Sequence, residues 1–336
     1  MAVFGGVMVA DARGTNDAGM KTRPRPRPKK GPPYDRTPSP GPAKPPSRGR
    51  TSARKSEPAL PAREPIGLPD LASLVPVGVP AGVPEMAAQM GIEFDRGDTD
   101  QLGRYLAMLL AANEVLNLTS VTDPVEAWRR HVLDSLTLLQ ALADLPDGSR
   151  VIDVGSGGGL PGIPLAVCMP GLAFTLLEAT GKKAAFLRAT VGALGLGNVT
   201  VAEARAETAG HDRGVRGPSG GRTGGHREVY DAVVARAVGR LATLAELTVP
   251  LVKVGGRVLL IKGERSDEEL HEAARALHLL KAVHAGTIGT PSGRIVVLAK
   301  QSAAPRDYPR RDGEPKRAPL GVARDERAAG KRIKRA

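Results

Sequence analysis

DVGSGGGLPGIP, residues 153–164, continues the apolar run VIDV at residues 151–154 of this 336-residue chain. Glycines in such a place let the backbone turn tightly and let a ligand approach within contact distance. The helix expected after the turn offers the unpaired N–H groups of its N-terminus to an anion. The strand–turn–helix pattern therefore predicts a ligand-binding turn, and a turn that only packs a strand on a helix is the alternative.

The spacing of the glycines narrows the class of ligand. A dinucleotide-binding G-x-G-x-x-G pattern needs glycine where Leu160 stands, and no Gly-Lys-Ser/Thr triplet closes the turn as in a P-loop. What remains is the pattern acidic-x-Gly-x-Gly-x-Gly, with Glu178 at the end of the next expected strand. An acidic residue there can accept both hydroxyls of an adenosine ribose, and the helix N-terminus can receive a carboxylate. S-adenosylmethionine carries both groups and is the cofactor that we predict.

Short apolar runs recur along the chain from this turn onward. Such runs predict strands at residues 151–154, 174–178, 199–202, 230–235, 257–262, 282–288 and 294–299. Helical stretches such as 181–194 and 266–280 separate them, which is typical of βαβ units and a mostly parallel sheet. The last two runs are separated by a short segment that contains TPSG, residues 290–293, so an antiparallel hairpin is expected to finish the sheet.

Helical patterns precede the turn. One begins near Asp100, and a second follows Asp123 and Pro124, which can cap a helix and occupy its first turn. We therefore expect a helical preface at residues 92–145 and an α/β core at residues 146–300. Within the core, the glycine-rich residues 210–227 are interpreted as a flexible insertion.

The basic charge of the chain lies at its two ends. The net charge is +13, yet residues 92–300 are formally neutral. Proline, arginine and lysine repeat through residues 23–50, so we expect a disordered basic extension over residues 1–91 and a basic tail over residues 301–336. Such basic flanks can bind a polyanion. For the N-terminal extension, a merely solubilising role is the alternative.

The amino-acid composition excludes several other classes of protein. The single cysteine, Cys168, excludes a disulfide framework within the chain, and no cluster of Cys and His has the spacing of a metal site. The opening residues lack a basic region before their apolar stretch, and no run of about 18 uncharged apolar residues occurs. We therefore expect a cytoplasmic, monomeric protein without metal or membrane span.

Several separated motifs together resemble the ribosomal RNA small-subunit methyltransferase G family, also called the glucose-inhibited division protein B family. The matching segments are NLT at 117–119, HVLDSL at 131–136, DVGSGGGLPGIPLA at 153–166, LEATGKK at 177–183, ARAE at 204–207, ARA at 235–237, LIKG at 260–263, and the tail at 308–320. The resemblance implies a Rossmann-like class I methyltransferase fold, with a seven-stranded mostly parallel sheet and N-terminal helices before it. It also implies transfer of a methyl group to guanine N7 in 16S ribosomal RNA.

The resemblance carries roles onto residues of this chain. Gly155, Gly157, Gly159 and Leu160 would contact the cofactor through the turn, Glu178 would hold its ribose, Ala206 and Glu207 would lie at its adenine, and Arg236 would lie beneath its methionyl part. Asn117, Arg129, His131 and Lys262 are candidates on the substrate side. Arg310, Arg311, Lys316 and Arg317 in the tail are expected to contact RNA.

No acid or base catalyst is expected. The lone pair of guanine N7 is free, so no proton has to leave before it attacks a methyl group, and catalysis depends on alignment. Methylation of a pyrimidine C5 would need a nucleophilic thiol, whereas Cys168 is expected to be buried in the helix after the turn. A methyltransferase acting on a small molecule or a protein, and a non-catalytic RNA-binding protein with this fold, remain the alternatives.

Overall fold

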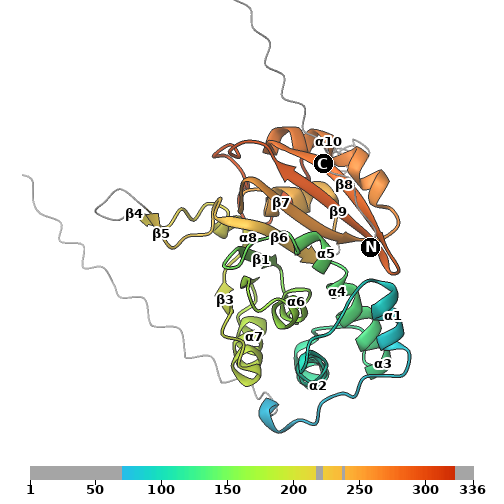
Figure 1. Cartoon of the computed structure of the whole chain (residues 1–336). Coiled ribbons are helices and arrows are strands. Elements are labelled where there is room, and N and C mark those ends of the chain that lie inside the picture. The colour runs from blue at the N-terminus through green and yellow to red at the C-terminus, as the bar shows by residue number, and fades with distance from the viewer. Residues whose placement is uncertain (1–69, 217–221, 237–238, 322–336) are drawn as a thin grey trace, which may run out of the picture. The chain divides into compact units, whose positions relative to one another are not determined.

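The computed structural model describes residues 70–216, 222–236 and 239–321, which contain a seven-stranded sheet (Figure 1). The strand order is β3-β2-β1-β6-β7-β9-β8. The strands are β1 (Arg150–Val154), β2 (Ala173–Glu178), β3 (Val199–Glu203), β6 (Tyr230–Arg236), β7 (Val252–Lys262), β8 (Ala282–Thr290) and β9 (Gly293–Lys300). All seven expected strands are present, and the mostly parallel α/β sheet is confirmed.

The direction of the strands brings the ends of five of them to one edge of the sheet. Neighbouring strands from β3 to β7 run parallel, whereas β9 runs antiparallel to both β7 and β8, as the hairpin prediction requires. The parallel strands end at Val154, Glu178, Glu203, Arg236 and Lys262. We call this the carboxyl edge, because ligands of open α/β sheets bind outside the carboxyl ends of the strands.

Helices precede the sheet and connect its strands. The preface holds η1 (Leu71–Ser73), α1 (Val83–Gln89), α2 (Asp98–Leu116), α3 (Pro124–Ala127), the π-helix η2 (Trp128–Leu133), α4 (Asp134–Leu136) and α5 (Leu139–Leu142). The core and tail hold α6 (Gly162–Cys168), α7 (Gly181–Leu194), α8 (Ala206–Ala209), α9 (Leu241–Thr248), α10 (Ser266–Leu280) and α11 (Glu314–Arg317). Asp123 caps α3 as expected, because its side chain accepts a hydrogen bond from the Glu126 N–H at 2.8 Å.

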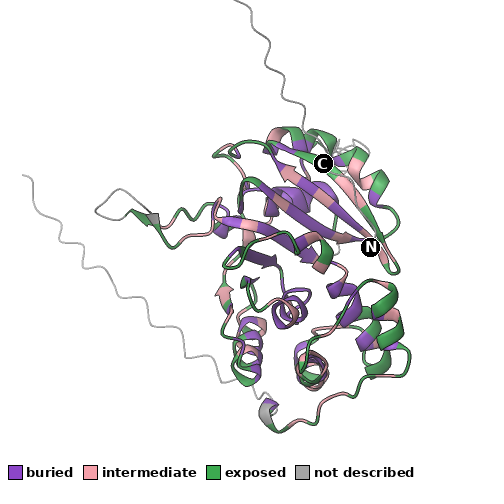
Figure 2. Cartoon of the chain, viewed as in Figure 1, coloured by how far each residue is buried: buried purple, intermediate pink, exposed green. Residues whose placement is uncertain are grey.

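Both faces of the sheet are buried. Side chains alternate along each strand, so Val151 and Phe174 pack with α2, α6 and α7, whereas Ile152 and Leu177 pack with α9 and α10. Figure 2 shows the central strands as buried between these helix layers. Burial on both faces explains why the strands are continuous apolar runs in the sequence.

The fold begins earlier than expected. Residues 1–69 lie outside the described residues, but residues 70–91 are folded, against the expectation of disorder up to residue 91. Val83 and Ala87 lie one helical turn apart in α1, and both are buried. The chain before α1 also packs on α2, because Val77 N–H donates to the carbonyl of Gly103 at 3.0 Å. This short apolar stripe outweighs the proline-rich surroundings on which the expected boundary was based.

The glycine-rich insertion and the tail are joined to the core. Residues 217–221 lie outside the described residues, while β4 (Val215–Arg216) pairs with β5 (Arg222–Thr223). Arg227, at the end of the expected insertion, is buried and donates to the carbonyls of Gly210, Ala304, Pro305 and Tyr308. Residues 301–321 therefore lie against the fold, and only residues 322–336 of the tail are outside the described part.

Lys300, the last residue of β9, is more deeply buried than Arg227 and lies directly before the tail. Its ammonium group lies 2.8 Å from the carboxylate of Glu228 and donates to the carbonyls of Val249 and Val252, while burial holds its pKa below the ordinary value. Lys300→Met should lower the free energy of unfolding by about 3 kcal/mol, because it removes the cation paired with Glu228 and the donor to two buried carbonyls. Urea unfolding, with exposed Lys316→Met as the matched control, measures this difference. Equal stability of the two variants would contradict the assignment.

Candidate cofactor and substrate site

The glycine-rich turn has one open side and one packed side. Gly155, Gly157 and Gly159 have φ angles of 75°, 57° and 97°, which are left-handed values that side chains rarely adopt. A Cβ atom on Gly155 would meet nothing within 4 Å, and one on Gly157 only the carbonyl oxygen of Gly155 at 3.8 Å. A Cβ on Gly158 would instead lie 2.6 Å from Leu109 of α2. Gly155 and Gly157 thus border open space, while the next glycines allow close packing.

Glu178 fixes the open side of the turn. One carboxylate oxygen accepts from the Gly157 N–H at 3.0 Å, and the other accepts from the Thr180 N–H at 2.7 Å. The side chain is buried at the end of β2. Because a carboxylate offers about four lone-pair positions, Glu178 can hold the turn and still accept hydrogen bonds from two ligand hydroxyls.

Asp153 supports the packed side of the turn. One of its carboxyl oxygens accepts from the Gly162 N–H at 3.0 Å, which fixes the start of α6, and the other has no hydrogen-bond partner among the described residues. Burial raises the pKa of this carboxyl group to about 7, against the lowering effect of the Gly162 bond.

These features fit the predicted cofactor. The open glycine turn leaves room for a backbone approach, and Glu178 presents acceptors at the place expected for a ribose. The described residues contain no group of three or more His, Cys, Asp and Glu side chains that could hold a metal ion. Within the same residues, no helix is long and apolar enough to cross a membrane.

Arg236 joins the sheet to the helical preface. From the end of β6 it donates to the carbonyl of Arg130 at 2.9 Å, and it lies 3.5 Å from the carboxylate of Asp134 and 3.4 Å from Nδ1 of His131. Ser292, in the turn between β8 and β9, donates to the other oxygen of Asp134. Three segments far apart in the sequence therefore meet at the carboxyl edge.

His131 is the buried centre of this cluster. It lies in the π-helix η2, a rare geometry that occurs frequently at functional sites. Its Nε2 atom lies 2.7 Å from the hydroxyl of Thr119. Burial, helped by the charge of Arg236, lowers the pKa of His131 to about 4, so its imidazole is neutral at pH 7.

The other candidates on the substrate side lie in different environments. Asn117, in a left-handed conformation after α2, is exposed, and half-exposed Arg129 forms an ion pair with Glu126 at 3.4 Å. Lys262 differs from the expectation, because its buried ammonium group lies 2.8 Å from Glu269. It also donates to the carbonyl of Gly239, so it supports the chain after β6 instead of facing a substrate freely.

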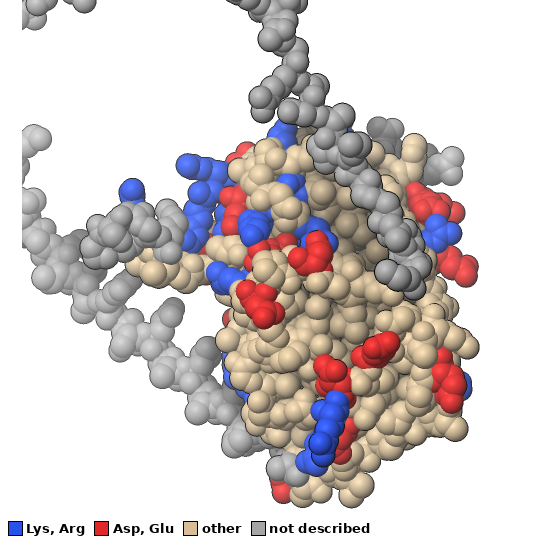
Figure 3. Space-filling model, in the orientation of Figure 1, with Lys and Arg blue, Asp and Glu red and all other residues tan. Residues whose placement is uncertain are grey.

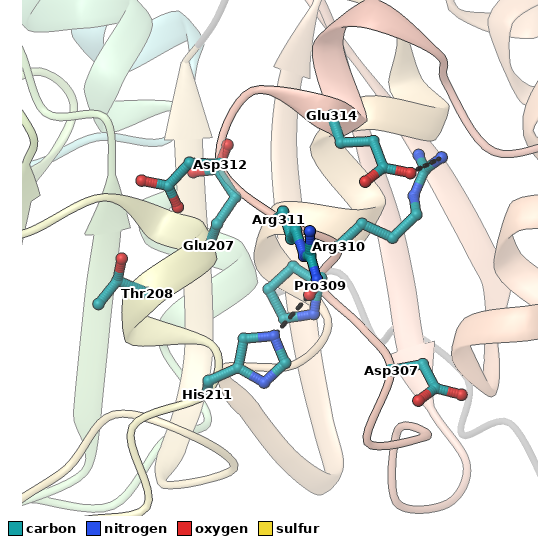
Figure 4. Close-up of a pocket in the computed structure, with 9 residues that line it drawn as sticks. All are labelled: Glu207, Thr208, His211, Asp307, Pro309, Arg310, Arg311, Asp312 and Glu314. Carbon is teal, nitrogen blue, oxygen red and sulfur yellow. Dashed lines mark hydrogen bonds and ion pairs between the residues drawn. The ribbon is translucent and has the colours of Figure 1, made fainter.

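Ala206 and Glu207 open α8, beside the end of β3. The buried carboxylate of Glu207 accepts from the Gly313 N–H at 2.8 Å, so this side chain attaches the tail instead of pointing freely toward an adenine. A pocket of about 500 Å³ lies between α8 and the tail. Figure 4 shows the residues that line it. Its lining residues are Glu207, Thr208, His211, Asp307, Pro309, Arg310, Arg311, Asp312 and Glu314.

The four tail residues that are expected to contact RNA divide into two kinds. Arg310 differs from the expected RNA contact, because its guanidinium binds both carboxylate oxygens of buried Glu246, at 2.8 and 2.6 Å. These bonds also hold the pKa of Arg310 above its ordinary value. Arg311, Lys316 and Arg317 are exposed and form no ion pair with the described residues.

Sequence reasoning missed four residues that organise the site. Asp134 pairs with Arg236, Ser292 donates to Asp134, and Thr119 binds His131. Asn113 accepts from the N–H groups of the two residues that follow Asn117. Asp134 and Thr119 lie inside the quoted HVLDSL and NLT motifs, so closer attention to their polar members could have found them. Nothing in the local sequence marks Ser292.

A matched pair of glycine substitutions tests the open side of the turn. Gly155 and Gly195 both have positive φ, of 75° and 66°, and a Cβ on either meets nothing within 4 Å. Alanine at either position should lower the free energy of unfolding by about 1 kcal/mol through backbone strain. Only Gly155→Ala should also raise the Kd for S-adenosylhomocysteine, by about tenfold or more in calorimetry. Equal affinities of the two variants would show that the ligand does not use this side.

Comparisons with known proteins agree on one family. The family described as "rRNA small subunit methyltransferase G" matches residues 98–292. "Ribosomal RNA small subunit methyltransferase G" of Sorangium cellulosum is 50% identical over 249 residues, covering 74% of this chain and 98% of that protein. The protein of the same name from Roseiflexus castenholzii is 42% identical over 240 residues, covering 70% and 97%.

Solved structures include a "SAM dependent methyltransferase from Aquifex aeolicus", which is 16% identical with a TM-score of 0.38. That similarity covers 51% of this chain and 92% of the other. The profile match spans more than half of this chain, and the Sorangium protein is aligned over nearly its whole length. The chain belongs to the rRNA small subunit methyltransferase G family.

Proposed function

We propose that this protein transfers a methyl group from S-adenosylmethionine to N7 of a guanosine in 16S, small-subunit ribosomal RNA. The observation that supports the proposal most strongly is the open glycine turn, with Glu178 at its side and the Arg236–His131 cluster at the same edge of the sheet. Family membership gives the class of substrate. The N7 atom follows from the resemblance on which the sequence prediction was based.

The cofactor, when bound, supplies an electrophilic methyl group on its sulfonium. In the proposed complex, Glu178 accepts the ribose hydroxyls while Gly155, Gly157, Gly159 and Leu160 follow the cofactor along the turn. Ala206 and the backbone of Glu207 border the adenine, since the Glu207 carboxylate is already bound to the tail. These residues hold the cofactor in one orientation, which gives the alignment that a direct methyl transfer requires.

The substrate side needs no proton acceptor, because guanine N7 has a free lone pair. The site agrees with that chemistry: His131 is neutral but has both ring nitrogens within hydrogen-bonding distance of Thr119 and Arg236. Arg236 is held by a carbonyl and a carboxylate beside the expected methionyl part. Exposed Asn117 and half-exposed Arg129 are proposed to contact the RNA around the target base.

The tail supplies the proposed contacts to the RNA backbone. Arg311, Lys316 and Arg317 are exposed, and the ion pair of half-buried Arg310 with buried Glu246 fixes the segment that carries them. On the face shown in Figure 3, most Lys and Arg side chains gather over the upper half and lie among Asp and Glu side chains. Such a mixed surface favours local phosphate contacts by a few fixed cations over a continuous basic groove.

The chemical outcome can be mapped directly. Purified protein with S-adenosylmethionine should place one N7-methylguanosine in unmodified small-subunit rRNA or small subunits, detected by cleavage at the modified base or by mass spectrometry of nuclease fragments. The glycine variant Gly155→Ala serves as the low-activity control. Methyl transfer to another atom, or only to protein, would contradict the proposal.

The RNA contacts of the tail predict a change in salt dependence. Replacing Arg311, Lys316 and Arg317 together by Gln should weaken binding of small-subunit rRNA and reduce the slope of log K against log salt concentration by about 2. The affinity for S-adenosylhomocysteine should stay unchanged. A control that replaces the exposed, ion-paired Arg104, Arg188 and Arg265 removes the same charge elsewhere. Equal slopes for the two triple variants would place the RNA on another surface.

A further inference from the structure

The hairpin formed by β4 and β5 extends away from the sheet (Figure 1). Residues 213–227, which include it, contain four arginines and no acidic residue. The register of the two strands places Arg216 opposite Arg222. Like charges at directly opposite positions destabilise an antiparallel pair, so an anion bound beside this pair would stabilise the hairpin. The hairpin therefore has the charge of an anion-binding element.

Hydrogen bonds fix the base of the hairpin on the fold. The N–H groups of His226 and Arg227 donate to the carbonyl of Asp212, at 2.9 and 2.8 Å. The side chain of Asp212 accepts from the Gly214 N–H at 2.9 Å. Gly225 allows the two strands to approach closely there, because a Cβ atom on it would overlap the backbone nitrogen of Gly214. The hairpin thus starts from a defined base, which reduces the entropy that a partner has to remove.

Arginines from three segments of the chain gather at this base. Burial lowers the pKa of Arg227, and the charges of Arg213 and Arg306 act in the same direction, so both lie near its guanidinium. Burial also lowers the pKa of the neighbouring His226, and here the charge of Arg150 at the start of β1 adds to the effect. Four exposed arginines therefore form one surface, which we call the basic ridge: Arg150, Arg213, Arg216 and Arg306.

The basic ridge keeps a positive charge within the protein. Exposed Asp212 and Asp307 place two negative charges beside its four positive ones. Arg150, Arg216 and Arg306 form no ion pair with any residue that the structure describes. Their guanidinium groups are therefore available to an anion that presents several oxygen atoms.

Phosphate groups of a nucleic acid match the chemistry of the basic ridge. Guanidinium groups bind phosphate oxygens in bidentate geometry. Residues 213–227 contain no Phe, Tyr, Trp or Met, the large side chains enriched in protein–protein interfaces, so an acidic protein would find little to pack against. Arg311, proposed above to contact RNA, lines the same pocket as His211, which directly precedes the hairpin base. The ridge therefore adjoins the proposed RNA surface of the tail.

The basic ridge lies away from the carboxyl edge. Arg150 begins β1, and Arg227 at the hairpin base lies three residues before Tyr230, where β6 begins. The seven residues of β6 then run to Arg236 at the carboxyl edge, roughly 20 Å at about 3.3 Å per residue. We propose that the basic ridge binds the phosphate backbone of small-subunit rRNA at a distance from the target guanosine, and so adds affinity without taking part in methyl transfer. This inference rests on the proposed function.

Two substitutions in the hairpin test this inference. Arg216→Gln with Arg222→Gln should raise KM and the Kd for small-subunit rRNA by about fivefold, and reduce the slope of log K against log salt concentration by about 1.5. The kcat at saturating RNA and the Kd for S-adenosylhomocysteine should stay unchanged. The matched control, Arg104→Gln with Arg188→Gln, removes the same charge from exposed ion pairs elsewhere. Arg306→Gln, outside the hairpin, should reduce the slope by about 1 and serves if the hairpin variant does not fold.

Three other outcomes would overturn the role of the basic ridge. Equal salt slopes for the hairpin and control variants would place the RNA on another surface, and a lower kcat with an unchanged KM would indicate a structural role. If the hairpin variant loses affinity for small subunits but binds protein-free rRNA as wild type does, the ridge contacts a protein. RNA binding is measured without turnover, so wild-type protein that binds this RNA but methylates no guanine would overturn the proposed function and not the ridge.

Discussion

The carboxylate of Glu178 accepts hydrogen bonds from Gly157 and Thr180, and so joins the turn after β1 to the turn after β2. A bond of this kind to an ionised acceptor is stronger than one between neutral groups. Asp153 adds a second tie, to the first residue of α6. These hydrogen bonds to Gly157 and Gly162 fix the glycine turn with its open side in place. The protein therefore does not have to order this segment when the cofactor binds.

The rest of the site depends on the sheet that carries this turn. Parallel strands end at a common edge, so Arg236 reaches the same region as Glu178 although 58 positions separate their numbers in the sequence. Ion pairing and hydrogen bonding through Arg236 then attach the helical preface, with His131 and Thr119, to that edge. The preface is thus part of the site, and the hairpin turn contributes through Ser292.

The elements were predictable because their signals are local. Apolar runs and turn residues indicated all seven strands, and the position of Glu178 at the end of the second run marked it as a candidate acceptor beside the turn. Long-range pairing gave no such signal. Arg310 looked like a free cation of a basic tail, but its partner Glu246 lies on α9, 64 residues away.

Lys262 and Glu207 show the same limit of sequence reasoning, since each binds a group that only the folded chain brings near. The boundary at residue 91 missed α1 for a different reason, because two buried residues are too short a pattern to recognise. The individual roles assigned to the cofactor-binding and substrate-side residues stay predictions.

The account depends most on the claim that the cofactor occupies the open side of the turn. A crystal structure of the protein with S-adenosylhomocysteine tests that claim most directly. We predict that the ribose hydroxyls lie within hydrogen-bonding distance of Glu178, that the ligand contacts Gly155 and Gly157, and that both backbone bonds to Glu178 persist. A ligand bound in the pocket between α8 and the tail, or a Glu178 side chain turned away from the ribose, would contradict the account.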